Sequence, residues 1–327
     1  MRRRWIGGLA LAVLVSGCGA TTAAPREPAP APPAASPAPS ASAADESGDA
    51  GSEGSAGTAT SPVRPSASTE ALDAPPAPDA AIPTSPDRLA KAVVTTEAAL
   101  KRAIDDWRGD DGKAGGEPPE AVVLWSLHQQ RLYRVLGHDA GLTRRTLARL
   151  PAAVADRARD NAEAARDLFD LTRPTSTPGR FRTQEPPRAE DLRGYMRGAE
   201  RRFGVDWEVL AAVMLVETKF GRLRSPSSAG AQGPMQFMPA TWKAYGLGGD
   251  VHDPRDAVTG AANYLRASGA PGDYRRALYA YNHDRRYVDA VQRYARQIRR
   301  DARAYYAYHS WQVFVLTTKG DLRLTGP

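Results

Sequence analysis

The feature that most constrains this chain is an apolar helical stretch that runs directly into a glycine-rich segment. Asp206 is a plausible N-cap for this helix, and Gly221 stands where a C-cap glycine belongs. Leu210, Val213 and Glu217 recur at helical spacing, so the carboxylate shares a face with core residues. Ionisation of a carboxyl group among apolar atoms is unfavourable, and the pKa of Glu217 is therefore expected to rise.

A raised pKa gives Glu217 a possible chemical role. A carboxylic acid that stays protonated near neutral pH can act as a general acid and protonate a glycosidic oxygen. The alternative is a half-exposed glutamate at a helix end, paired with Lys219 or Arg222. Perturbed acids mark functional sites only on average, so the helix alone leaves both interpretations open.

The segment that follows, residues 227–239, is rich in glycine and small side chains. Glycines allow a backbone to approach a ligand closely. Gln236 offers both a donor and an acceptor, which suits the hydroxyl and acetamido groups of a sugar. Pro239 then opens a short helix that contains Trp242. The segment therefore favours a sugar-binding loop beside the acid.

At this point the chain resembles a known family, the soluble lytic transglycosylases, whose catalytic domain is similar to goose-type lysozyme. Three family motifs occur in order, namely Glu217-Thr218, Gly233-Pro234-Met235-Gln236 and Ala280-Tyr281-Asn282. The resemblance covers residues 190–308. Two positions depart from the family pattern, with Thr218 in place of serine and Pro234 in place of leucine. Both changes are small, and we expect them to tune the groove without abolishing the chemistry.

The resemblance implies a role for each matching residue. Glu217 is the expected catalytic residue, and no metal or cofactor is implied. The expected substrate-binding residues are Ser227, Met235, Gln236, Tyr281 and Asn282. In the family, the tyrosine hydroxyl faces the reacting sugar or the acid, and the asparagine helps to bind the sugar. An aromatic and amide pair at a helix end can also be no more than a cap with packing.

The resemblance further implies a reaction on peptidoglycan. One glutamate protonates the oxygen between N-acetylmuramic acid and N-acetylglucosamine, and then acts as base while the C6 hydroxyl of the muramic acid attacks C1. The product is a 1,6-anhydro end. A muramidase is the first alternative, because hydrolysis with water normally uses two carboxylates, and Asp284 or another acid would be its base. A non-catalytic wall-binding lipoprotein is the second, although the joint presence of Glu217, Gln236 and Asn282 argues against it.

Residues 1–18 have the layout of an export signal. Three arginines precede an apolar run that is too short to span a bilayer. Residues 15–18 resemble a bacterial lipobox, which would make Cys18 the lipidation site and the first residue of the mature protein. Cys18 is the only cysteine in the chain, and the alternative is a chance cysteine in a leader. We therefore expect an extracytoplasmic lipoprotein, anchored to the bacterial envelope membrane.

Residues 19–88 are dominated by alanine, proline and serine, and we expect a disordered tether or a plain spacer. Residues 89–327 hold 38 basic and 28 acidic residues. This excess of positive charge suits a polyanionic partner such as a cell-wall polymer or membrane head groups. Nucleic acid is not expected, because no binding motif is present and the export signal argues against it. An arginine-rich solvated surface is the simplest alternative.

The fold class predicted for the chain is mainly α. Residues 89–171 form a helical region, which is either a scaffold packed on the catalytic domain or a small domain of its own. Residues 172–189 are expected to be a proline-rich linker. The resemblance implies a lysozyme-like catalytic domain over residues 190–308. Its last predicted helix is a long one, with an apolar stripe from Tyr287 to Tyr305. Residues 309–327 are expected to form a β-hairpin.

Two sets of polar residues resemble metal ligands. Asp250, His252, Asp253 and Asp256 lie close together in the sequence. However, Asp253 followed by a proline is explained as a helix cap, so metal binding is not expected there. His128 and His138 are likewise not in ligand spacing.

Overall fold

The computed structural model describes residues 74–110 and 112–326 of the chain. The elements in this part are α1 (Pro86–Arg108), α2 (Glu120–His138), α3 (Ala140–Leu147), α4 (Ala152–Leu171), a 3-10 helix (Pro178–Arg180), α5 (Ala189–Phe203), α6 (Trp207–Thr218), α7 (Pro239–Tyr245), α8 (Pro254–Ala267), α9 (Tyr274–Tyr281), α10 (Arg285–Arg300), α11 (Arg303–His309), β1 (Phe314–Thr317) and β2 (Gly320–Arg323). The predicted export signal, Cys18 and most of the predicted tether lie outside the described residues.

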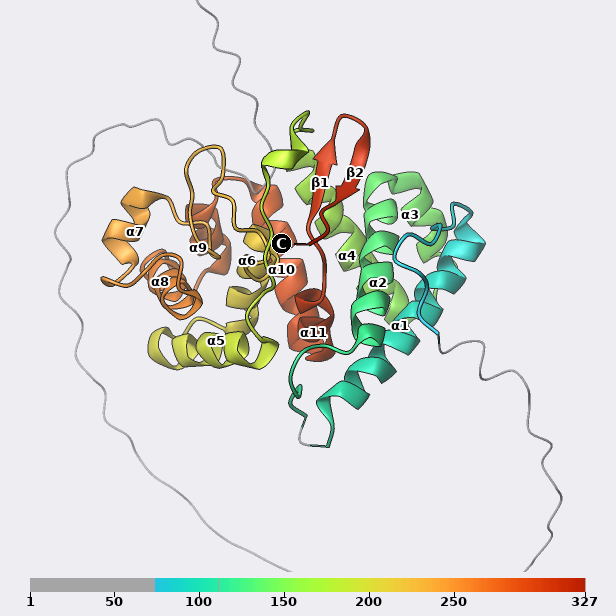
Figure 1. Ribbon diagram of the computed structural model, residues 1–327, viewed down its shortest axis with the longest axis horizontal. Helices are drawn as coiled ribbons and strands as arrows, with labels where there is room; N and C mark the ends of the chain where they lie inside the picture. Colours follow the sequence, from blue (N-terminus) through green and yellow to red (C-terminus); the bar gives the residue numbers. More distant parts are fainter. Residues whose placement is uncertain (1–73, 111, 327) are drawn as a thin grey trace, which may run out of the picture. The chain divides into compact units, whose positions relative to one another are not determined.

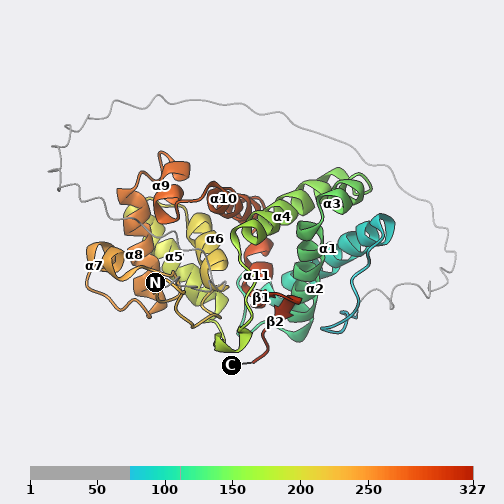
Figure 2. The same cartoon turned by 90° about the horizontal axis from the view of Figure 1, so that it is seen from above.

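The helices form two groups around a central pair. Helices α1 to α4 lie on one side, α5 to α9 lie on the other, and α10 and α11 lie between them (Figures 1 and 2). Helix α10 packs against α4 in the first group and against α6 in the second. One continuous apolar core extends from Leu89 to Trp311. The helical region of residues 89–171 is therefore a scaffold that shares its core with the predicted catalytic domain, and the separate-domain alternative is wrong.

Helix α6 lies at the centre of its group. From Val209 to Thr218 every side chain is buried. A helix that is apolar on all sides can only be stable when neighbours cover all of its faces, and α5, α8, α10 and α11 do so here. Glu217 is part of this buried helix, so the fold itself removes its carboxylate from water.

The long terminal helix predicted from Tyr287 to Tyr305 is interrupted at Asp301. The Asp301 backbone is extended, with φ −151° and ψ 111°, and its side chain accepts a hydrogen bond from the Arg303 amide at 3.0 Å. Aspartate competes for backbone donors in this way and so ends α10 and begins α11. The apolar periodicity continues across the break, which is why the sequence pattern alone predicted one helix.

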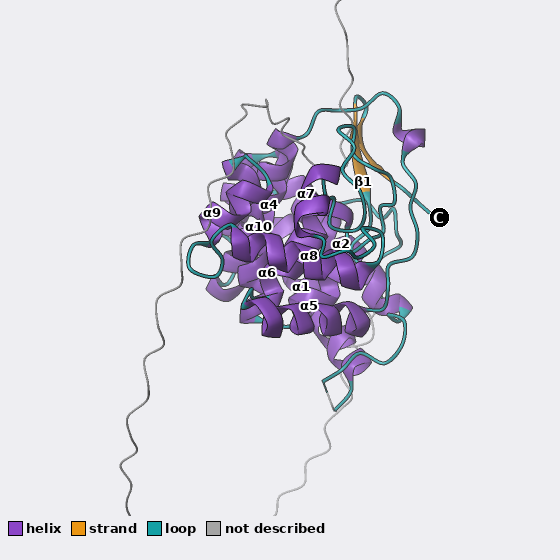
Figure 3. Cartoon of the chain, turned by 90° about the vertical axis from the view of Figure 1, so that its left-hand side faces the viewer, coloured by secondary structure: helices purple, strands orange, loops and turns teal. Residues whose placement is uncertain are grey.

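The segment predicted as a linker does not run free. Thr175 bridges Thr317 in β1, and Thr183 bridges Leu223 beyond α6. Phe181 is buried in a second, small apolar cluster with Leu223, to which Val313, just before β1, and Val315, within β1, also belong. The hairpin itself is confirmed, with β1 and β2 antiparallel. Figure 3 shows that the strands and many loops lie together on one side of the helical body.

The first helix begins earlier than predicted. Helix α1 starts at Pro86, and the residues just before it are held by Arg131, whose guanidinium donates to the carbonyls of Pro78 and Ala80 at 3.0 and 2.7 Å. The prediction of a disordered tether up to residue 88 is therefore wrong for residues 74–88. Among the described helices, none combines the length and the hydropathy needed to cross a membrane.

Candidate active site

Glu217 lies in the last turn of α6 and is only 4% exposed. Burial raises the pKa of its carboxyl group to about 8 from the ordinary value of 4.5, although the Tyr287 hydroxyl and, to a smaller extent, Lys219 act in the opposite direction. The Tyr287 hydroxyl donates a hydrogen bond to Glu217 Oε1 at 2.7 Å. The predicted rise in pKa is thus confirmed, and the alternative of a half-exposed glutamate at a helix end is wrong.

Tyr287 is a residue of the site that sequence reasoning missed. It lies in the first turn of α10, and its side chain is fully buried. In the sequence it is only one member of an apolar stripe, and nothing distinguishes it from the core tyrosines of the same region. The packing of α10 against α6 alone brings its hydroxyl to Glu217.

The two ends of α6 differ in detail from the prediction. Asp206 occupies the N-cap position, but its carboxylate pairs with Arg299 at 2.6 Å and makes no capping hydrogen bond. At the other end Lys219, not Gly221, takes the left-handed cap conformation, with φ 54°. Burial lowers the pKa of the Lys219 ammonium group to about 8, and this group donates to the Leu215 carbonyl at 2.9 Å. The cap therefore places a lysine close to the acid.

Thr218 joins the acid helix to the glycine-rich loop. Its hydroxyl donates to the Pro234 carbonyl at 2.6 Å and accepts from the Gly221 amide at 2.9 Å. A serine could make the same two hydrogen bonds. This departure from the family motif therefore keeps the polar contact, while the extra methyl group is buried.

The loop around Gln236 is held in a strained conformation. Gln236 has φ +49°, and Gly233 has φ +71° with so little space that a Cβ atom would lie 1.9 Å from the Val251 carbonyl oxygen. The Gln236 side chain is 8% exposed and donates to the Gly233 carbonyl at 3.0 Å. Its Oε1 is buried without a hydrogen-bond partner among the described residues. An unsatisfied buried acceptor in a strained loop is a ready site for a ligand donor.

Tyr281 supports the same loop from α9. Its hydroxyl donates to the Met235 carbonyl at 2.7 Å, and its ring packs against Phe237 and Tyr264. The pKa of Tyr281 is raised by burial and by the nearby Glu217 carboxylate. Met235 itself is fully buried in the core. These contacts fit a structural role for the Met235 side chain, while its predicted contact with substrate stays a prediction.

Ser227 closes the loop that leads from the acid helix to Gln236. Its hydroxyl oxygen accepts from the Ala231 and Ala229 amides at 2.9 and 3.3 Å, and its own amide donates to the Ala231 carbonyl. The side chain is 7% exposed. Ser227 therefore fixes the loop, and its hydroxyl proton remains available for another acceptor.

Asn282 and Asp284 follow α9. Asn282 is the C-cap residue of this helix and is buried. Asp284 is the N-cap of α10, and its carboxylate accepts from the amide and the guanidinium of Arg286. Hydrogen bonds from Arg286 hold the pKa of the Asp284 carboxyl group below its ordinary value. A carboxylate engaged in this way is a weak candidate for the general base of a muramidase.

Within the part of the chain that the structure describes, no group of three or more His, Cys, Asp or Glu side chains could hold a metal ion. The three aspartates among the residues that resemble ligands accept backbone hydrogen bonds. Asp253 caps α8 by accepting from the Asp256 amide, Asp256 accepts from the Asp250 amide, and Asp250 accepts from the His252 amide. The interpretation of Asp253 as a helix cap is confirmed.

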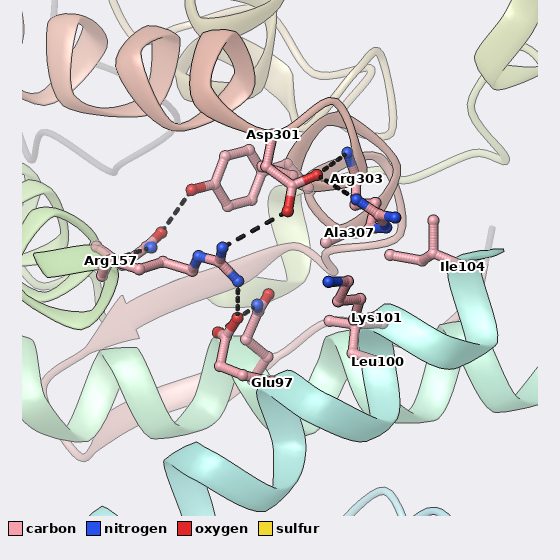
Figure 4. Close-up of a pocket in the computed structure, with 12 residues that line it drawn as sticks. Glu97, Leu100, Lys101, Ile104, Arg157, Asp301, Arg303 and Ala307 are labelled. Atoms are coloured by element: carbon pink, nitrogen blue, oxygen red, sulfur yellow. Dashed lines mark hydrogen bonds and ion pairs between the residues drawn. The ribbon is translucent and has the colours of Figure 1, made fainter. Parts of the chain in front are cut away.

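A second cluster of buried polar groups lies between α1, α2, α4 and α11 (Figure 4). Glu97 accepts hydrogen bonds from Gln129, Tyr133 and Arg157, and Arg157 also pairs with Asp301 at 3.5 Å. The cavity beside them, about 20 Å³, has room for roughly one water molecule. With every partner matched and no room for a ligand, this cluster connects four helices and is not a second active site.

Residues 194–305 match the family described as the transglycosylase SLT domain. The chain contains an SLT domain. A transglycosylase of Enterobacteria phage PRD1 is 36% identical over 85 residues, which are 26% of this chain and 31% of that protein. The membrane-bound lytic murein transglycosylase F of Thiobacillus denitrificans is 33% identical over 82 residues, which are 25% of this chain and 17% of that protein. No solved structure matches.

The SLT domain begins within α5 and ends in α11, so it includes all the predicted site residues from Glu217 to Asn282. The mainly α, lysozyme-like fold class is confirmed. The chain spans less than a third of the length of either relative. The scaffold helices α1 to α4 and the hairpin lie outside the matched residues, although they share the core of the SLT domain or pack beside it.

Proposed function

We propose that this protein is a lytic transglycosylase of peptidoglycan. It cleaves the β-1,4 bond between N-acetylmuramic acid and N-acetylglucosamine and leaves a 1,6-anhydro end, with Glu217 as general acid and then base. The observation that carries the proposal is the state of this carboxyl group, which is 4% exposed and has a pKa raised by burial to about 8. At neutral pH it holds the proton that the leaving oxygen requires.

The neighbouring residues support a reaction with one carboxyl group. Tyr287 donates to Oε1 of Glu217 and so fixes the orientation of the acid. After proton transfer the same hydrogen bond stabilises the carboxylate, which then takes the proton of the attacking C6 hydroxyl. The Gln236 Oε1 is buried without a partner in the described part of the chain, and in this proposal it accepts a hydrogen bond from a sugar hydroxyl or amide. No metal or cofactor has a role in this scheme.

Hydrolysis by water is the second candidate from the sequence. It needs a second carboxylate as base, for which the sequence offers Asp284 or another acid. Because Arg286 engages Asp284 through hydrogen bonds that lower its pKa, this residue is poorly suited to accept a proton from water. The transglycosylase reaction is therefore the better supported of the two.

The test is mass spectrometry of the fragments that the full chain releases from purified peptidoglycan. The proposal expects fragments lighter by one water than hydrolysis products, and their loss in the Glu217→Gln variant. Reducing-end products that depend on Glu217 would instead establish a muramidase. Fragments that persist in Glu217→Gln would remove this residue from the mechanism, and bound glycan without fragments would favour a wall-binding protein.

We further propose that the protein is held in the bacterial envelope by lipid attached to Cys18, which lies outside the described residues. The support is the lipobox-like sequence at residues 15–18 and the absence of any other cysteine in the chain. One of the relatives carries the name membrane-bound lytic murein transglycosylase. Cys18→Ser would leave the protein in the soluble fraction, whereas unchanged membrane recovery and an unmodified mass at Cys18 would contradict the anchor.

A further inference from the structure

An open groove of about 730 Å³ runs beside the loop that carries Ser227. One wall is residues 180–183, from the segment that the sequence predicted as a linker, and the other wall is residues 224–228. Backbone contacts hold the two walls in register. The Arg224 amide donates to the Arg182 carbonyl at 2.9 Å, and the Arg182 amide donates to the Ser225 hydroxyl at 2.7 Å.

The groove carries an uncompensated positive charge. Arg180, Arg182 and Arg224 line it and are all exposed, and no carboxylate is among the lining residues. Within residues 74–110 and 112–326 none of these three guanidinium groups forms an ion pair, whereas the adjacent Arg222 pairs with Glu185 at 3.1 Å. Such a set of arginines attracts anions and is suited to bind carboxylates through paired hydrogen bonds.

Two of the three arginines, Arg180 and Arg182, are also held in place by their surroundings. The Arg180 guanidinium lies over the Phe181 ring, 5.3 Å from its centroid, and Phe181 is anchored in the small apolar cluster beneath the groove. The Arg182 guanidinium donates to the Gly179 carbonyl at 2.7 Å. Positively charged groups that are already oriented lose less entropy when a ligand binds.

The groove is joined directly to the candidate active site. Leu223, next to the groove wall, donates from its amide to the carbonyl of Thr218, the residue after Glu217, at 3.0 Å. The second wall then continues through the loop to Gln236. A ligand in the groove would therefore contact the segment that joins Glu217 to the loop of Gln236.

We propose that this groove binds the peptide branch of peptidoglycan through its carboxylates. This inference rests on the proposed function, because the muramic acid that the site would hold carries such a peptide on its lactyl group. The branch has free carboxylates for the arginines and amide groups for the hydroxyls of Thr183, Ser227 and Ser228. The SLT domain would then distinguish glycan that carries peptides from glycan that has been stripped of them.

The test measures binding of the full chain in the Glu217→Gln background, so that no substrate is consumed. Two probes are compared, soluble glycan strands with intact peptides and the same strands after enzymatic removal of the peptides. Replacing Arg180, Arg182 and Arg224 together by glutamine is expected to weaken binding of the peptide-bearing strands about tenfold, as for the loss of several exposed ion pairs. Binding of the stripped strands stays unchanged.

Arg202→Gln is the matched control. Its guanidinium lies over the Phe203 ring at 5.0 Å, as that of Arg180 lies over Phe181, but it is on α5 and outside the groove. This variant is expected to bind both probes as the parent does. Arg224→Gln alone provides a second test that spares the fold, because its guanidinium makes no hydrogen bond to any other residue that the structure describes. We expect about threefold weaker binding of peptide-bearing strands.

Each other outcome overturns the inference. An equal loss on both probes would mean that the arginines hold glycan or maintain the fold, and no loss would mean that the groove takes no part. A phosphate polymer of the cell wall is the third probe, and a loss confined to it would assign the groove to phosphate. Failure of the proposed function is seen separately, as absence of fragments from the parent chain, and leaves the comparison of the two binding probes intact.

Discussion

Two buried glutamates, Glu97 and Glu217, show how the same side chain takes opposite roles in one core. Glu97, in α1, is 8% exposed and is surrounded by donors, namely the Arg157 guanidinium, the Gln129 amide and the Tyr133 hydroxyl. Glu217, in α6, is 4% exposed and accepts one hydrogen bond, from Tyr287. Burial is similar for both, and the partners differ.

The two sites differ in whether an ion-pair partner offsets the buried negative charge. A buried carboxylate with a cation and neutral donors is stable as an ion, and its removal leaves the cation uncompensated. A buried carboxyl group without an ion-pair partner keeps its proton and can transfer it. The first arrangement connects helices, and the second prepares an acid. Exchanging or removing the partners of either glutamate therefore tests the interpretation of both.

The largest effect is expected from Glu217→Gln on activity. Release of peptidoglycan fragments should fall about 10³-fold or more, because general acid catalysis contributes on the order of 10² to 10⁴ and the same group also serves as base. Glu208→Gln, in the first turn of the same helix, is the control and should retain activity. The rate of fragment release under saturating substrate decides the matter, and a Gln variant within tenfold of the parent would contradict the assignment.

Next in size is the effect of Glu97→Ala on stability. The free energy of unfolding should fall by about 1–3 kcal/mol, because Gln129 and Tyr133 lose a buried acceptor, while Arg157, which is 33% exposed, keeps its pair with Asp301. Asp156→Ala removes a surface ion pair with Arg159 and should change stability by less than about 1 kcal/mol. Chemical denaturation measures both. Equal effects would mean that the Glu97 cluster does not connect the scaffold helices to α11.

The pH dependence of stability tests the burial of Glu217 further. The pKa of Glu217 is raised to about 8 from 4.5, so between these values the native state keeps a proton that the unfolded state has lost. Stability of the parent therefore falls as pH rises through this window, whereas Glu217→Gln has no proton to lose. Between pH 5 and pH 9, the free energy of unfolding of the variant should therefore rise relative to that of the parent, by on the order of a few kcal/mol.

Denaturation midpoints at a series of pH values provide the measurement. Lys219, whose pKa burial lowers to about 8, is present in both proteins, so the difference reports on Glu217. A difference that does not vary with pH would show that Glu217 ionises normally. Activity should also decline above about pH 8, where the general acid loses its proton.

The smallest effect is expected from Tyr287→Phe. Loss of one buried hydrogen bond to Glu217 should reduce stability by about 1 kcal/mol. The hydroxyl stabilises the ionised form, so its removal should raise the pKa of Glu217 and shift the alkaline limb of the pH–activity profile upward. Tyr305→Phe also removes one buried hydroxyl, which donates to the Ala189 carbonyl, and should lower stability without moving the profile.

The main features of the acid helix were predictable from local patterns. The run of apolar side chains from Val209 to Val216 predicts a helix that neighbours cover on all faces. Glu217 directly follows this run and continues its helical spacing. The C-cap was assigned to Gly221 and belongs to Lys219, which takes the left-handed conformation while its ammonium group donates to the Leu215 carbonyl. This conformation is rare for a lysine, so residue type alone favoured the glycine.

Other features depended on which helices pack together. The break at Asp301 is invisible in an apolar stripe that continues on both sides of it, and the roles of Tyr287 and Arg157 depend on neighbours far away in the sequence. The course of residues 172–189 could not be predicted for a similar reason. A proline-rich segment has no periodicity, and only its bridges to Leu223 and Thr317 make it a wall of the groove.

The sequence by itself determined that this chain folds as helices around a buried acid, and its three ordered motifs resemble those of the soluble lytic transglycosylases. These are short-range properties, set by periodicity, caps and residue type. Only the tertiary structure decided that Glu217 has a tyrosine for its partner while Glu97 has an arginine, and that α1 to α4 share its core. Burial and pairing depend on the sum of contacts from distant segments, and no local pattern contains that sum.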